Sequence, residues 1–187
     1  MRIIRIGCLA MVTLGTAGAA SDVVVYVSTN KPVNNAELVA SSIFKGAGIS
    51  VEWRRGAPAA EPAGAVAIHV TLSEDPSPDT PPDTLAVSYP YAGTDKGITV
   101  FYKRLREMAG SAIPEQTLLG HVLAHEIGHV LEGLDSHSPE GVMKARWNHK
   151  DFTRMQDAPL SFSREDMDFL HNGLEARRKG TLRSFVP

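Results

Sequence analysis

Residues 114–137 read PEQTLLGHVLAHEIGHVLEGLDSH, and the part up to Glu132 has the pattern of an α-helix. Apolar side chains fall on nearly every side of it, so we expect this helix to be buried inside the protein. Glycine costs a helix about 1 kcal/mol relative to alanine, so Gly120 and Gly128 predict that a neighbouring segment packs closely there. The apolar residues are Leu118, Leu119, Val122, Leu123, Ile127, Val130 and Leu131.

Two histidines and a glutamate give this helix a specific chemical capacity. His125 and His129 are four residues apart, so they share one face of a helix and both imidazoles can reach one metal ion. Glu126 lies beside them, where it can accept a proton from a water molecule and pass it to a leaving group. The alternative is a core helix whose histidines bond to backbone groups, because a buried imidazole needs a partner.

Catalytic zinc usually has three protein ligands, and the residues after the helix provide candidates for the third. Gly133 follows the helix directly and can adopt the left-handed conformation that ends a helix and reverses the chain. Asp135 and His137 come next in the sequence and can turn back toward the ion. Both remain candidates at this point.

The segment resembles the metzincin clan of zinc metallopeptidases, whose motif is H-E-x-x-H-x-x-G-x-x-H followed downstream by a Met-turn. His125, Glu126 and His129 match the motif directly, and Met143 lies where the Met-turn would pass beneath the metal. The resemblance implies Zn²⁺ as the cofactor, Glu126 as the catalytic general base, and an extended peptide bound along an edge strand.

The spacing departs from the motif at the third ligand. Gly133 comes one residue late, so counting along the motif selects Asp135, whereas His137 stands four residues after the glycine. A chain that turns at Gly133 leaves Asp135 only two residues in which to return. We therefore predict His125, His129 and His137 as the metal ligands, with Asp135 as the alternative. Other H-E-x-x-H enzymes take a glutamate from a later helix, and Glu165 is that candidate here.

The rest of the chain predicts an α+β fold. Runs rich in β-branched residues predict strands, and two further segments have helical patterns. The strands are expected at 23–29, 50–55, 65–72, 85–91 and 98–105, and the helices at about 34–46 and 163–178. Pro90 favours an edge position for 85–91. With the metzincin resemblance, this order predicts a mixed, mostly parallel twisted sheet with an antiparallel edge strand, packed on the histidine-bearing helix and flanking helices.

The N-terminus has the features of an export signal. Residues 1–20 contain two arginines, then a short apolar run, and end in small residues, which is typical of a signal peptide. We expect 21–187 to form a single metalloprotease-like catalytic domain that is secreted or periplasmic. Cys8 is the only cysteine and lies within the expected signal peptide, so the mature domain would have no disulfide.

The composition limits the classes of binding partner that we expect for this protein. The chain has 187 residues, a formal net charge of -2 and 43% hydrophobic residues, and it has no basic run of the kind that binds nucleic acid. We therefore expect a monomeric zinc-dependent endopeptidase that acts on protein or peptide substrates, with no nucleic-acid partner and no membrane insertion after signal cleavage. A non-catalytic, zinc-stabilised binding module and a metal-free structural domain are the alternatives.

Overall fold

The computed structural model describes residues 21–57, 62, 64–76, 80–89, 97–110 and 112–179. The expected signal peptide, residues 1–20, lies outside this part. The elements within it are β1 (Val23–Ser28), α1 (Asn34–Gly46), β2 (Val51–Arg55), β3 (Val66–Ser73), β4 (Ala86–Ser88), β5 (Gly97–Phe101), α2 (Tyr102–Ala109), α3 (Glu115–Glu132), α4 (His149–Asp157) and α5 (Arg164–Arg178).

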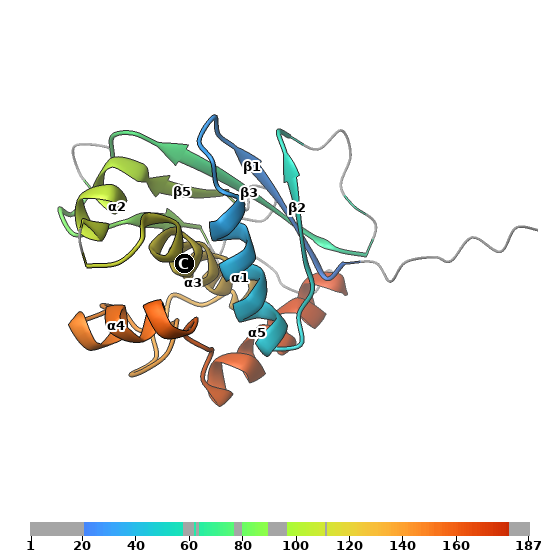
Figure 1. Ribbon diagram of the computed structural model, residues 1–187. Coiled ribbons are helices and arrows are strands. Elements are labelled where there is room, and N and C mark those ends of the chain that lie inside the picture. Colours follow the sequence, from blue (N-terminus) through green and yellow to red (C-terminus); the bar gives the residue numbers. More distant parts are fainter. Residues whose placement is uncertain are drawn as a thin grey trace, which may run out of the picture.

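The described strands form one sheet in the order β2-β1-β3-β5-β4. Neighbours pair in parallel except at the end of the sheet, where β4 runs antiparallel to β5 (Figure 1). Both faces of β1 are buried: Val23, Val25 and Val27 belong to the main core, and Val24 and Tyr26 to a small cluster of their own. The predicted α+β fold, with its mostly parallel sheet and antiparallel edge strand, is confirmed.

Helices α1 and α5 both pack on α3, and glycines let them approach it closely (Figure 1). A Cβ on Gly120 would lie 2.6 Å from the Val39 Cβ and 2.7 Å from the Ala36 carbonyl oxygen of α1. A Cβ on Gly173 of α5 would clash with the Leu131 carbonyl of α3. The close packing predicted at Gly120 is therefore confirmed, and α3 is held between two helices.

The structure corrects the sequence prediction at two places. The expected strand 98–105 ends at Phe101, where α2 begins and buries Leu105 completely. Residues 103–109, KRLREMA, are mostly strong helix formers, and their preference prevails over the aromatic run before them. Helix α4 was not predicted. Asn148 starts it with a capping box, in which Asn148 and Asp151 exchange side chain–backbone hydrogen bonds,.

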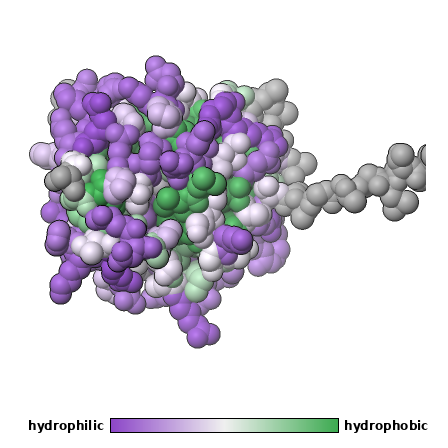
Figure 2. Space-filling view, viewed as in Figure 1, coloured by the Kyte–Doolittle hydropathy of each residue, from purple (hydrophilic) through white to green (hydrophobic). Residues whose placement is uncertain are grey.

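The surface is mainly hydrophilic in the view of Figure 2. Hydrophobic residues gather near the middle of this face, over α1, where Leu38 is 69% exposed. None of the helices in the described part of the chain is both long and apolar enough to cross a membrane.

Candidate metal centre

Helix α3 ends in the chain reversal that the sequence predicts. Gly133 has φ 68° and ψ 28°, a left-handed conformation, and its N–H donates to the His129 carbonyl at 3.0 Å. Any residue with a Cβ would be strained there. Residues 134–137 are exposed and have no regular structure. They lead the chain back so that the His137 ring lies beside the rings of α3.

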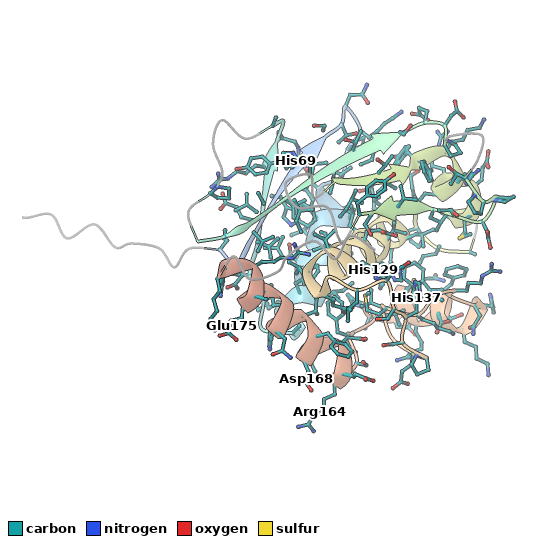
Figure 3. All side chains as sticks on the ribbon, turned by 180° about the vertical axis from the view of Figure 1, so that it is seen from behind. His69, His129, His137, Arg164, Asp168 and Glu175 are labelled. Carbon is teal, nitrogen blue, oxygen red and sulfur yellow. The ribbon has the colours of Figure 1, made fainter. Side chains whose placement is uncertain are left out.

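The three predicted histidines come together. The ring centroids of His125 and His129 are 4.6 Å apart, and the His137 centroid lies 4.9 Å from His129 and 5.3 Å from His125. One possible ligand atom from each ring lies within 4.8 Å of the others. Figure 3 shows His129 and His137 side by side at the end of α3. Asp135 and Glu165, though both described, do not belong to this group.

Backbone carbonyls fix the tautomers of the two helix histidines. The His125 Nδ1 donates to the Val142 carbonyl at 2.8 Å, and the His129 Nδ1 donates to the Leu134 carbonyl at 3.1 Å. A carbonyl can only accept, so each Nδ1 carries the proton and each Nε2 presents a lone pair. Burial lowers the pKa of His125 to about 4 and also lowers the pKa of His129. Both imidazoles are therefore neutral at neutral pH, as metal ligands must be.

The arrangement of these nitrogens fits a metal ion. The two Nε2 atoms face each other at 3.0 Å, and two lone pairs at that distance repel unless a cation lies between them. Tetrahedral zinc with bonds of about 2.0–2.1 Å separates its nitrogen ligands by roughly 3.3 Å, close to the observed spacing. The carbonyl bonds at Nδ1 are the outer interactions that usually orient ligating histidines.

Glu126 lies between the histidines and the edge strand. Burial raises the pKa of Glu126, while a hydrogen bond with the Ser88 side chain of β4 acts in the opposite direction. A carboxyl group with a raised pKa exchanges protons more readily near neutral pH than an exposed glutamate does. Glu126 is thus placed for proton transfer next to the three imidazoles.

Met143 packs directly against the histidine-bearing helix. Its side chain is completely buried, and a Cβ on Gly128 would lie 2.7 Å from the Met143 sulfur. The close contact predicted at Gly128 is therefore made by a side chain. The preceding residue, Val142, supplies the carbonyl that orients His125. The segment around Met143 thus supports both the helix and one of the three rings.

Ser138 holds the loop that carries His137, the third histidine of the group. Its N–H donates to the Met143 carbonyl at 2.9 Å, and its hydroxyl donates to the Asp166 carboxylate. Asp166 is buried in the first turn of α5 and also accepts from the Ser163 N–H at 2.7 Å. Ser163 and Asp166 have capping-box spacing, which is a sequence signal for the start of α5 but not for the bond from Ser138 to Asp166. Because Ser138 follows His137, α5 helps to position the third histidine.

Aromatic residues of the expected strand 85–91 and of the loop after Met143 differ in where they lie. The Trp147 ring centroid lies 5.7 Å from that of His125, with the rings nearly perpendicular, so Trp147 borders the histidine group. Tyr89 is 61% exposed. Tyr91 lies outside the described residues.

The remaining histidines stand apart from the group. His121 is completely buried and bonds to the backbone of Thr117 and Leu160. His69 stacks on Tyr26 at 5.5 Å, His149 begins α4, and His171 donates to the Ala47 carbonyl. These four histidines therefore occupy packing or surface positions outside the group.

Comparison with known proteins adds one finding. No family model and no curated protein matches the chain. Among solved structures, a zinc-dependent peptidase from Methanocorpusculum labreanum (strain Z) is similar, with a TM-score of 0.52 and 16% sequence identity. The similarity covers 79% of this chain and 99% of that chain. At this identity it shows a shared fold.

Proposed function

We propose that the protein is a zinc-dependent endopeptidase of the metzincin type. His125, His129 and His137 are the zinc ligands, and Glu126 is the general base. The observation that carries the proposal is the convergence of three imidazoles, two of them with Nε2 lone pairs 3.0 Å apart, beside the half-buried carboxyl group of Glu126. The fold that the chain shares with a zinc-dependent peptidase supports it.

The residues of the site have distinct parts in peptide hydrolysis. When bound, zinc polarises the scissile carbonyl and lowers the pKa of water. Glu126 takes a proton from the attacking water, whose oxygen bonds to the carbonyl carbon. The C–N bond then breaks, and Glu126 passes the proton to the amine that leaves. Burial supports this role, because it raises the pKa of Glu126 toward the working pH.

The edge strand provides a place for the substrate. β4 is the last strand of the sheet in the described part of the chain, and it contacts α3. Its outer backbone groups can pair with an extended peptide, which is a common way to hold a peptide chain. Ser88 connects this strand to Glu126, so a peptide bound there would lie next to the base.

We propose that Met143 forms the Met-turn. We also propose that the mature protein is secreted or periplasmic.

The direct test is hydrolysis of an unfolded protein such as casein and of a broad peptide library by the zinc-loaded mature chain. We expect cleavage that stops with a zinc chelator and returns with added zinc. Glu126→Ala should lower kcat by at least about 100-fold, since general base catalysis contributes about that much or more. Glu175→Ala, which removes an exposed acid on α5, is the matched control and should retain activity.

Zinc content measured on the same samples separates the alternatives. Glu126→Ala should still bind one equivalent of zinc, because Glu126 is not a ligand. Bound zinc without cleavage of any library member would contradict the proposal and favour a non-catalytic binding module. Absence of zinc from carefully prepared protein would favour a metal-free domain.

A further inference from the structure

Two segments border the histidine group from different parts of the chain. One is the β4 strand with the residues before it, which reaches the group through Ser88 and Glu126. The other is the loop of residues 141–148, which reaches it through Trp147 beside His125. A peptide that lies along β4 and passes the histidines must also pass this loop.

An ion pair joins these two segments. The Arg146 Nη2 lies 2.6 Å from the Asp83 Oδ2. Asp83 precedes β4 by a few residues, and Arg146 is the neighbour of Trp147. Both side chains remain accessible, with 83% of Arg146 and 51% of Asp83 exposed. A pair this exposed contributes little to stability, so another carboxylate can displace Asp83 at small cost.

Both partners stand on firmly held backbone. The Arg104 guanidinium donates to two backbone carbonyls in the segment that carries Asp83, at 2.6 Å to Pro81 and 3.2 Å to Thr84. On the other side, the Lys144 ammonium lies 2.6 Å from the Asp151 carboxylate at the start of α4. The cation of Arg146 is therefore presented from a fixed loop, next to the path of the substrate.

We propose that Arg146 is a specificity-determining residue that selects peptides with a carboxylate at one position near the scissile bond. In the free protein Asp83 occupies the guanidinium, and the substrate carboxylate replaces it. The carboxylate belongs to an Asp or Glu side chain or to the C-terminus of a short peptide, because a guanidinium binds both in the same two-pronged geometry. This inference rests on the proposed peptidase function and adds the substrate class.

The test is kcat/KM on matched internally quenched peptides that share one neutral reference sequence. Each carries Glu, Gln or Lys at a single position, scanned on both sides of the scissile bond, and one further set ends in a free carboxylate or an amide. We expect one position, or the free terminus, to favour the negative charge over its neutral counterpart. The preference should be about twofold in wild type, where the new ion pair replaces the exposed Arg146–Asp83 pair, and up to about fivefold in Asp83→Asn, the value of one exposed ion pair.

Three variants assign the preference to this residue. Arg146→Ala should cleave the neutral reference at the wild-type rate and lose the preference, and Arg146→Glu should favour Lys at the same position. Asp83→Asn should increase the preference, because Arg146 is then unpaired before substrate binds. Arg54→Ala is the matched control, since it removes an exposed, paired arginine from β2 at the far end of the sheet.

The outcomes separate this inference from the function on which it rests. Cleavage of the neutral reference without any charge preference, or a preference that survives Arg146→Ala, overturns the role of Arg146 and leaves the peptidase intact. A wild-type enzyme that cleaves none of the peptides overturns both.

Discussion

Three histidines recur at intervals of four along α3, yet the first differs in kind from the other two. The His121 Nδ1 donates to the Thr117 carbonyl at 2.7 Å, and its Nε2 accepts from the Leu160 N–H at 3.0 Å. Both ring nitrogens are therefore satisfied by the protein. His125 and His129 also donate from Nδ1 to carbonyls, but their Nε2 atoms face each other.

The difference shows what distinguishes a structural histidine from a candidate ligand. Burial and spacing are shared by both kinds, and burial lowers the pKa of each ring. What differs is the second nitrogen: in His121 it has a backbone donor, whereas in His125 and His129 it faces only another lone pair and the ring of His137. The two Nε2 lone pairs that face each other therefore mark this group of histidines as the candidate cation site.

The largest expected effect concerns the third member of the metal group. His137→Ala should weaken zinc binding by at least about 100-fold, because loss of a ligand costs more than loss of an outer-shell partner, which costs about 10- to 100-fold. Asp135→Ala should change zinc affinity by less than about threefold, as expected for a surface substitution. Competition against a chelator of known zinc affinity measures both variants.

His129→Ala serves as the reference for complete loss, since this residue is a ligand under every arrangement considered. Equal losses in His129→Ala and Asp135→Ala, with His137→Ala unaffected, would show that the aspartate is the third ligand. They would also mean that the Gly133 turn rearranges when metal binds.

A smaller effect is expected at the structural histidine. His121→Leu leaves the buried Leu160 N–H without an acceptor, which should lower the free energy of unfolding by about 1–3 kcal/mol. Urea unfolding in the presence of a chelator measures this without the contribution of bound metal. His121→Gln can still offer an oxygen to that N–H and should recover part of the loss.

The zinc affinity of the same variant tests whether His121 contributes to the metal group. In folded His121→Leu it should stay within about threefold of wild type, because His121 is outside the metal group,. A loss as large as that of His137→Ala would mean that the division between the two kinds of histidine is wrong.

The sequence predicted much of this arrangement because its decisive features are local. Helix α3 follows from periodicity, and the reversal follows from Gly133, the residue type that adopts a positive φ most readily. The shifted spacing pointed to His137. Local signals also existed for α2 and α4, in a run of helix-forming residues and the Asn148 capping box. They were masked by the aromatic residues before α2 and by the short length of α4.

Other features depend on contacts between distant segments and left no readable pattern. The bond from Ser138 to Asp166 joins the turn after α3 to α5, and the Arg146–Asp83 pair joins two loops. The partners of His121 are of the same kind, because Leu160 lies far along the chain. Residue spacing shows which side chains share a helix face, but it does not show which backbone groups fold over that face.

Glu132 tests whether an unpaired buried atom is by itself a sign of a metal site. Glu132 is only 8% exposed, its Oε1 has no hydrogen-bond partner among the described residues, and burial, with the nearby Asp166, raises its pKa to about 8. Unlike the Nε2 atoms of His125 and His129, this oxygen does not converge with other ligand atoms in a candidate metal group. We therefore expect Glu132 to cost stability when ionised and to have no part in zinc binding.

The sign of the pH dependence follows from the raised pKa of Glu132. Between about pH 4.5 and 8 the unfolded chain releases a proton that the folded protein keeps, so the free energy of unfolding falls as pH rises,. Glu132→Gln should flatten this fall, with its greatest stabilisation relative to wild type near pH 8. Urea midpoints across this range measure the slope, and Glu107→Gln, at an exposed position, should leave it unchanged. If the free energy of unfolding depends on pH equally in wild type and Glu132→Gln, water reaches the Glu132 carboxylate. Glu132 would then differ from His125 and His129 only because its oxygen does not meet other possible ligand atoms.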